Sequence, residues 1–276
     1  EKMLEMAGVT SADVVYDPAH YQALADILDV HLEDGGSILL TESLRADARV
    51  VFDAALSAAD PKVSIRKALR VEGPNLRVGE WTYDLSAFSR ILVVGAGKAS
   101  AQMASAVEEV LRDRIDGGWI NTKYGHEAPL GRIEVHACGH PVPDDAGIAG
   151  TERIVRLLAD ADERTLVLCL MSGGGSALMP APADGIDFSE KQETTRLLLA
   201  CGATINELNA IRKHLSKVKG GQLARIAFPA AIVSLILSDV IGDPLDVIAS
   251  GPTAADESDF GLCLGILRKY EIEDRV

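Results

Sequence analysis

The sequence predicts an α/β fold, a Rossmann-like three-layer α/β/α arrangement with a mainly parallel sheet. Short apolar runs alternate with segments of helical period along most of the 276 residues, and this alternation is typical of a parallel sheet covered on both faces. The clearest run, residues 91–94, leads into a glycine turn and then a helical pattern. Glycine-rich and charged motifs follow several of the predicted strands, where ligands bind in such sheets.

The first 43 residues show no pattern that assigns them a role, so we treat them as a lead segment. A long helix follows, capped by Thr41 or Ser43, and its apolar face would consist of Ala48, Val51, Phe52, Ala55 and Leu56. Pro61 is expected to begin a short helix that ends near residue 70. Residues 76–85 alternate loosely and favour an edge hairpin.

The rest of the chain alternates between strands and helices. After the strand at 91–94 we expect strands at 118–121, 133–137, 166–170 and 232–237. Helices are expected from Asp144 or Asp145 to about residue 159, and at 189–200, 204–216 and 258–270. Asp243, Pro244 and Asp246 have the order of a further helix start, with a cap, a proline and an acid in the first turn.

The composition excludes several classes of protein. With 47% hydrophobic and 25% charged residues the chain is ordinary for a soluble globular protein. Its formal net charge of −14 argues against binding to nucleic acid or to an anionic membrane surface, and no apolar run is long enough to cross a membrane. The four cysteines form no Cys-x-x-Cys pair, so free thiols in the cytoplasm are expected. A homodimer is compatible with the sequence.

Lys98 is unusual because it follows the first glycine turn, at the expected start of a helix. A cation there opposes the helix dipole at a cost of about 0.3–1 kcal/mol, and a bound anion would reverse that cost. We therefore predict a catalytic role for Lys98 and nucleotide-phosphate contacts at Gly95 and Gly97. The alternative is a surface lysine that extends into water.

Two common nucleotide motifs can be tested at this turn, and both fail. A P-loop would need glycine in place of Leu92 and Ser or Thr in place of Ala99. A dinucleotide-binding turn would need glycine in place of Ser100 and an acid near the end of the next strand, where Lys123 stands. The sequence therefore predicts phosphate binding without the NAD signature.

A second glycine turn follows the strand at 166–170. Its backbone N–H groups and two hydroxyls could bind phosphate oxygens, although three glycines could equally form a flexible loop. The cofactor-binding residues predicted here are Ser172, Gly173, Gly174, Gly175 and Ser176.

Charged side chains elsewhere could hold the substrate and a metal. Asn209, Arg212 and Lys213 lie on one helical face, followed by Lys217 and Lys219, and could bind a carboxylate or phosphate; a solvated, acid-paired face is the alternative. Asp239 directly follows a strand and is the candidate for Mg²⁺ ligation or for the catalytic base. Lys123 and His140 follow other strands and are further candidates for substrate contacts. No His and Cys residues have zinc-site spacing.

Taken together, these motifs resemble the glycerate 2-kinase family with a C-terminal MOFRL domain, also called DUF4147. The resemblance covers residues 44–276 and rests on six segments in the family's order: GAGKAS (95–100), TKYGH (122–126), GHPVPD (139–144), SGGGSAL (172–178), NAIRKHLS with KGG (209–221) and LSDVIGDPLDVIASGPT (237–253). It implies ATP- and Mg²⁺-dependent phosphorylation of the 2-hydroxyl of D-glycerate, with Lys98 and Asp239 as the active-site lysine and aspartate.

The sequence departs from the family pattern in two places, at residues 1–43 and in the lack of the MOFRL domain within the 276 residues. That domain is expected to complete the active site, so we expect residues 1–276 alone to be weakly active or inactive. Two alternatives remain, an NAD(P)H-dependent hydroxypyruvate reductase and a non-catalytic anion-binding module.

Overall fold

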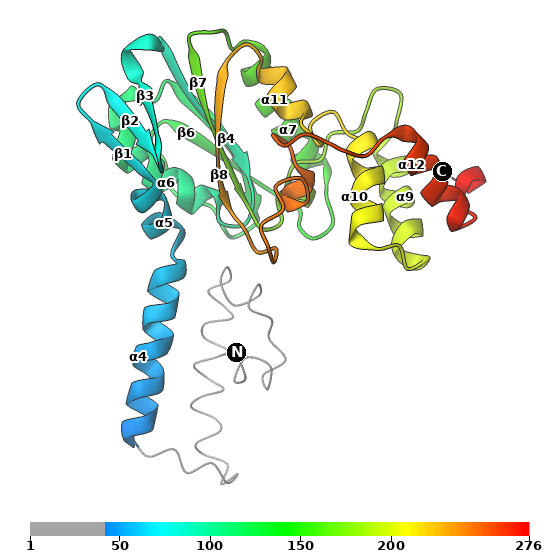
Figure 1. The fold of residues 1–276 in the computed structure, drawn as a ribbon, viewed down its shortest axis with the longest axis horizontal. Helices are drawn as coiled ribbons and strands as arrows, with labels where there is room; N and C mark the ends of the chain where they lie inside the picture. Colours follow the sequence, from blue (N-terminus) through cyan, green and yellow to red (C-terminus); the bar gives the residue numbers. More distant parts are fainter. Residues whose placement is uncertain (1–41, 276) are drawn as a thin grey trace.

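The computed structural model describes residues 42–275, and its centre is a five-stranded parallel sheet (Figure 1). The strands lie in the order β6-β5-β4-β7-β8. If only the strands of this sheet are counted along the chain, the order is 3-2-1-4-5. This is the order of a Rossmann fold. Their bounds are Arg90–Ala96 (β4), Gly117–Lys123 (β5), Ile133–Cys138 (β6), Thr165–Ser172 (β7) and Ala231–Leu237 (β8).

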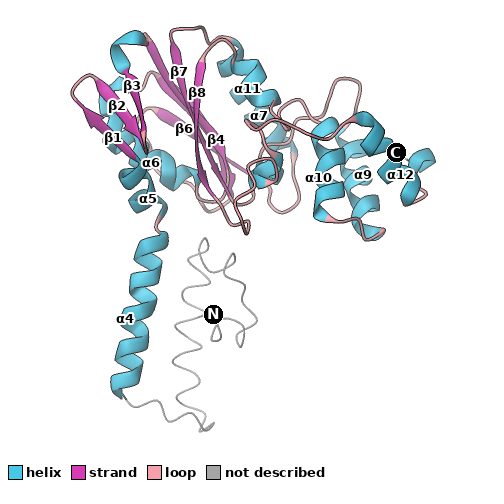
Figure 2. Cartoon of the chain, viewed as in Figure 1, coloured by secondary structure: helices cyan, strands magenta, loops and turns pink. Residues whose placement is uncertain are grey.

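Successive residues of the central strands are buried on opposite faces of the sheet, because a strand has a side-chain period of two. Ile91 and Val93 of β4 join the core beneath helix α6 (Ser100–Leu111). Leu92 and Val94 join the opposite core, to which α7 (Asp145–Ala159) and α11 (Gln222–Ala227) contribute. The predicted three-layer α/β/α fold is therefore confirmed, and Figure 2 shows the layers.

A small antiparallel sheet joins the face that α6 covers. It consists of β1 (Leu69–Glu72), β2 (Asn75–Val78) and β3 (Trp81–Asp84), next to helix α5 (Pro61–Ala68). The predicted hairpin is confirmed, but residues 69–70, expected to end the preceding helix, begin β1 instead. Leu69 and Leu76 are buried in the core here, and this burial favours the strand.

Helix α4 (Glu42–Ala59) projects away from the body of the molecule (Figure 1). Of its predicted apolar face, Phe52 and Leu56 are partly buried, whereas Val51 and Ala55 are exposed. The predicted cap at Thr41 or Ser43 and the lead segment up to residue 41 lie outside the part of the chain described at side-chain level.

Three helices form a separate cluster at the other end of the molecule (Figure 1). Helices α9 (Phe188–Ala200), α10 (Ile205–His214) and α12 (Phe260–Lys269) share an apolar core that includes Leu197, Ile211 and Ile266. Glu207 closes a capping box with Thr204 at the start of α10, and it also accepts hydrogen bonds from Lys269 and Tyr270 at the end of α12. The helices expected at 189–200, 204–216 and 258–270 are confirmed.

The helix expected to start at Asp243 does not form, and that prediction is wrong. The N–H groups of Val247 and Ile248 both bond to the carbonyl of Pro244, but the turn ends in the short 3₁₀ helix η3 (Ile248–Ser250). Asp243, Ala249 and Ser250 have φ of 51°, 51° and 61°, and left-handed residues interrupt a right-handed helix.

The remaining elements are short. They are α8 (Gly175–Leu178), η1 (Leu85–Ala87), η2 (Arg112–Arg114) and η4 (Glu273–Arg275). Among the described residues, no helix combines the length and apolar character needed to cross a membrane.

Candidate functional site

The first glycine turn, which follows β4, is closed by hydrogen bonds inside the protein. The backbone N–H of Gly97 donates to the Asn121 carbonyl (3.2 Å), and that of Lys98 donates to the Gly173 carbonyl (2.9 Å). The next N–H, of Ala99, donates to Ser172 Oγ (3.0 Å). The N–H groups expected to bind an anion at this turn are thus used within the fold.

Gly95 and Gly97 allow β4 and its turn to approach β7 closely. A Cβ atom added at Gly95 would overlap the Leu170 carbonyl oxygen, and one at Gly97 would overlap the Ser172 hydroxyl. The structure therefore gives both glycines a packing role, and Ser172 a role in closing the first turn. Their contact with a nucleotide stays a prediction.

The second glycine turn, after β7, faces outward. Gly173 lies directly against the Asp239 carboxylate, and Gly174 (φ 83°) lies against His140 Nε2 and the Lys98 side chain, so that a Cβ at either glycine would force these side chains to shift. Within residues 42–275, the N–H groups of Gly174 and Ser176 donate to no other group. This turn therefore offers the free donors that the first turn lacks.

Each of the five parallel strands delivers one element of the site at its carboxyl end. Lys98 follows β4, Lys123 ends β5, His140 follows β6, the Gly173–Gly174 turn follows β7, and Asp239 follows β8. β4 and β7 are neighbours whose chains leave in opposite directions along the sheet, and this switch point is where ligands bind in such folds. The sheet thus brings together the predicted catalytic and nucleotide-binding segments.

The electrostatics of His140 show how closely these side chains are grouped. Burial lowers the pKa of His140, the positive charges of Lys98 and Lys123 lower it further, and the Asp239 carboxylate opposes them. The imidazole is therefore held neutral at physiological pH, as a hydrogen-bonding group.

The end of β5 and the segment that follows it support the turn that contains Lys98, a role that sequence reasoning missed. Thr122 Oγ1 donates to the Gly97 carbonyl (3.1 Å), and His126 Nδ1–H donates to the Lys98 carbonyl (3.2 Å). Both bonds fix the backbone from which the Lys98 side chain extends. The TKYGH pattern pointed to this segment, but spacing could not show that it contacts main-chain carbonyls.

A cavity of about 750 Å³ adjoins the strand ends. His140, Gly174 and Ser176 line it from the sheet, Lys191 from α9, and Arg212 from α10, together with Lys219. Arg212 was predicted as a substrate contact and Lys219 as part of the basic cluster that follows it, whereas Lys191 was not predicted. Lys219 stands in the KGG segment on which the family resemblance partly rests. Lys191 lies among other polar residues of α9, and the sequence pattern there gives no sign that its side chain points into a cavity.

The other members of the predicted basic face lie elsewhere. Lys213 Nζ is paired with Asp246 (3.2 Å) and Asp256 (3.3 Å). Asn209 is buried, and its Oδ1 accepts a hydrogen bond from Ser250 Oγ (3.3 Å). The structure thus gives both residues internal partners, and their contact with substrate stays a prediction.

Asp239 is the acidic group among the residues at the strand ends. Its side chain is exposed, and among the described residues it has no ion-pair or hydrogen-bond partner. No group of three or more His, Cys, Asp or Glu side chains in the described part could hold a metal. A single exposed carboxylate is a donor that a Mg²⁺ ion held mainly by phosphate and water oxygens could use, and ligation by Asp239 stays a prediction.

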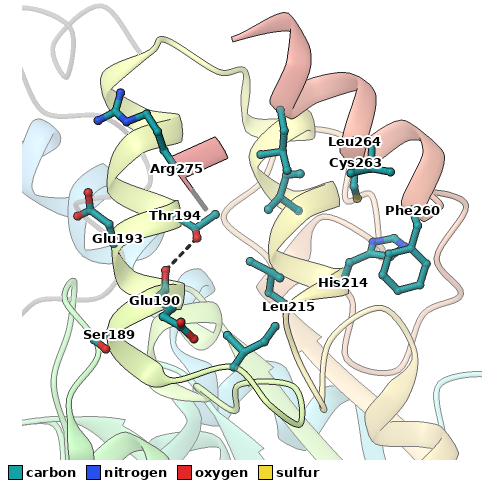
Figure 3. A pocket seen from close by; sticks show the side chains of 13 residues that line it. Ser189, Glu190, Glu193, Thr194, His214, Leu215, Phe260, Cys263, Leu264 and Arg275 are labelled. Carbon is teal, nitrogen blue, oxygen red and sulfur yellow. Dashed lines mark hydrogen bonds between the residues drawn. The ribbon is translucent and has the colours of Figure 1, made fainter. Parts of the chain in front are cut away.

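A second cavity, of about 650 Å³, lies among α9, α10 and α12 (Figure 3). Leu215, Phe260 and Leu264 are among the apolar side chains that line it, and Thr194 Oγ1 bonds to the Glu190 carbonyl at 2.8 Å. It contains no glycine turn and no residue from the strand ends. The candidate site is therefore the first cavity with its adjoining cluster.

Comparison with known proteins identifies the family. The model of DUF4147, described as a domain of unknown function, matches residues 47–276. The chain belongs to the DUF4147 family. Its matched region contains all the strands and helices of the body except α4, of which it contains the larger part.

Relatives of this DUF4147 chain include named enzymes. A D-glycerate 2-kinase from Thermotoga maritima is 45% identical over 210 residues, which cover 76% of this chain and 50% of that protein. An Agrobacterium vitis relative, provisionally named hydroxypyruvate reductase, is 42% identical over 245 residues, covering 88% and 53%. The crystal structure of glycerate kinase from Thermotoga maritima superimposes with a TM-score of 0.75 at 41% identity, covering 84% of this chain and 53% of that one. The chain thus spans about half the length of the relatives it matches.

Proposed function

We propose that the protein transfers the terminal phosphoryl group of ATP to the 2-hydroxyl of D-glycerate, forming 2-phosphoglycerate. The observation that supports this most directly is the convergence of Lys98, His140, Asp239 and the open glycine turn at the switch point of the sheet. Phosphoryl transfer requires cations and donors around the phosphates and a carboxylate for a metal. The Thermotoga maritima relative, named D-glycerate 2-kinase, gives the reaction its substrate.

The roles follow from charge and position. Lys98 and Lys123, whose positive charges both act on His140, would neutralise charge on the transferred phosphoryl group, and the second glycine turn would donate N–H groups to the nucleotide phosphates. Asp239 would hold Mg²⁺, which when bound supplies positive charge to the phosphate oxygens. Neutral His140, between Gly174 and the cavity, is placed to hydrogen-bond a hydroxyl of the acceptor.

The acceptor's acidic group would lie in the cavity, where Arg212 offers a planar fork that suits a carboxylate. We also propose a reducing, cytoplasmic location, since Cys138, Cys169, Cys201 and Cys263 are all free thiols.

The reductase remains the competing function because of the name of the Agrobacterium vitis relative. Against it stands Lys123 at the end of β5, the strand beside β4. An NAD-binding enzyme of this fold places there an acid that binds the ribose.

One experiment separates the functions. The full-length protein is incubated with ATP, Mg²⁺ and D-glycerate, and the product is identified by ³¹P and ¹³C NMR; a second sample receives NADH and hydroxypyruvate. We expect 2-phosphoglycerate and ADP in the first sample and no NADH oxidation in the second. NADH consumption without ADP formation would establish the reductase, and ligand binding without turnover in either sample would establish a binding module.

A further inference from the structure

Three cations line the 750 Å³ cavity without a carboxylate partner. In the described part of the chain, no Asp or Glu oxygen lies within 4.0 Å of Lys191 Nζ, Lys219 Nζ or the Arg212 guanidinium. Nearby cations are paired: Lys213 contacts two aspartates, Lys217 contacts Asp184 (2.6 Å) and Arg196 contacts Glu193 (2.6 Å). The three residues, which we call the cation triad, thus differ from these paired neighbours in having no carboxylate partner.

Two members of the triad are almost completely buried. Lys191 is 8% exposed and Lys219 is 2% exposed. Their ammonium groups contact only neutral oxygens: Lys191 Nζ donates to the Ala181 carbonyl (3.4 Å), and Lys219 Nζ donates to the carbonyl (2.8 Å) and Oγ (2.9 Å) of Ser176. Burying a charge without an opposite charge is costly, so a triad with no ligand is unfavourable in the fold.

The titration behaviour agrees with that reasoning. Burial, followed by the charge of Arg212, lowers the pKa of Lys191 to about 8. Burial, followed by the charges of Lys191 and Arg212, lowers the pKa of Lys219 well below its ordinary value. The other titratable or charged groups facing the cavity are His140 and the Glu193–Arg196 pair. An anion bound among the three would raise both lysine pKa values again.

A hydrogen-bonded chain fixes the position of Lys219. Ser176 Oγ, which accepts from Lys219, also bonds to Ser250 Oγ (3.0 Å), and Ser250 contacts Asn209 of α10. Ser250 and its neighbour Ala249 adopt left-handed φ to reach this position. Two of the three N–H groups of Lys219 are used by Ser176, and the third can donate to a ligand.

We propose that Lys191, Arg212 and Lys219 form one oxyanion-binding site, which takes a carboxylate or phosphate group of a substrate. The site is built, since a buried network holds it and α9 and α10 supply its walls. His140 and Gly174 line the same cavity, so the bound group lies next to the strand-end cluster. The existence of the site does not depend on the proposed kinase function. Only the choice between the carboxylate of the acceptor and a phosphate of the donor as its ligand rests on that function.

Calorimetric titration of the full-length protein tests the site without turnover. The probes are D-glycerate, which carries a carboxylate, and inorganic pyrophosphate, which carries phosphates. The variants Lys191→Met, Arg212→Ala and Lys219→Met are compared with Arg196→Ala as a control. Arg196 lines the same cavity, but its guanidinium is already paired with Glu193. We expect each triad variant to weaken one probe by about tenfold or more, and the Arg196 control to bind it as the wild type does.

The probe that the triad variants weaken identifies the source of the oxyanion. Titrations at pH 8.5 in buffers of different ionisation enthalpy should also show proton uptake by the wild type and less uptake by Lys191→Met, a difference that a merely structural lysine would not produce. Should Lys219→Met fail to fold, the other two variants decide.

The proposal is overturned if the wild type binds neither probe, or if Lys191→Met and Arg212→Ala bind both as the wild type does. Triad-dependent binding by a protein that forms no 2-phosphoglycerate would retain the site and reject the kinase.

Discussion

Lys98 lies near the start of a helix, where a positive charge is unfavourable, but its backbone is held by hydrogen bonds. Its N–H and carbonyl are both bonded inside the protein, to Gly173 and His126, so the turn does not depend on the side chain. We therefore expect Lys98→Ala in the full-length protein to lower turnover in the proposed kinase reaction by about 10²–10³-fold while its melting temperature stays near that of the wild type. Lys98→Arg should not restore turnover, because a planar fork does not replace a compact charge.

Steady-state assays and thermal melts of both variants measure these effects. Lys217→Ala serves as the control, since Lys217 is a half-exposed lysine paired with Asp184. Near-normal turnover of Lys98→Ala would return Lys98 to the interpretation of a surface lysine.

Asp239 has an exposed carboxylate whose position against Gly173 is its main structural feature. Asp239→Asn keeps the shape of the side chain and removes the charge that would hold Mg²⁺. We expect turnover to fall by about 10²–10³-fold and the Mg²⁺ concentration for half-maximal rate to rise. Asp243→Asn, in the same exposed loop, should change neither quantity. If the two variants show the same magnesium dependence, Asp239 is not the metal ligand.

At the scale of elements, the strands and most helices were predictable because each carries a local signal. A buried strand such as β7 is a continuous apolar run, and Asp144 caps α7 by accepting from the Gly147 N–H, as expected. The failures arose where long-range packing decided the conformation. Residues 69–70 pair with β2 rather than extending α5, and Pro244 is followed by left-handed residues that lead Ser250 to Ser176.

The site was partly predictable for the same reason. Strand ends are visible in sequence, so Lys98, Lys123, His140 and Asp239 could be placed at one edge of the sheet. Which N–H groups are free depends on contacts between β4 and β7, and sequence could not show that the first glycine turn is closed. Nor could it separate Arg212, which lines the cavity, from Lys213, which pairs with two aspartates.

The close approach of β4 and β7 can be tested with two strand glycines. Gly95→Ala would force a methyl group into the Leu170 carbonyl, whereas the Cβ of Gly117→Ala meets open space. We expect Gly95→Ala to lower the free energy of unfolding by about 1–3 kcal/mol or more, and Gly117→Ala to change it by about 0.5 kcal/mol or less. Urea denaturation of both variants measures the difference, and equal stabilities would contradict the packing role of Gly95.

At the scale of the whole molecule, the site joins two structural units. The parallel sheet supplies the strand-end cluster, and the helical cluster of α9, α10 and α12 supplies Lys191 and Arg212. Electrostatic cost is concentrated where they meet, because Lys191 and Lys219 of the cation triad are buried there without a counter-charge. The stability of the unliganded molecule should therefore depend on pH through the triad.

The sign of that dependence follows from proton counts. Lys191 has a pKa of about 8 in the folded protein and about 10.4 when unfolded, so between these values the unfolded chain binds more protons. The free energy of unfolding therefore rises with pH across this window, by up to about 1.4 kcal/mol per pH unit from Lys191. Lys219, whose pKa is also lowered, adds to the rise in the same direction.

Lys191→Met should remove the Lys191 part of this rise and be at least as stable as the wild type at pH 7, since an apolar side chain of similar length replaces an uncompensated charge. Urea denaturation at pH 7, 8, 9 and 10 measures both slopes, and the difference between the two proteins cancels contributions from other groups. Saturating pyrophosphate or D-glycerate, whichever binds, should flatten the wild-type slope because the bound anion raises the lysine pKa values. Parallel slopes for the two proteins without ligand would show that Lys191 titrates normally and that its burial carries no electrostatic cost.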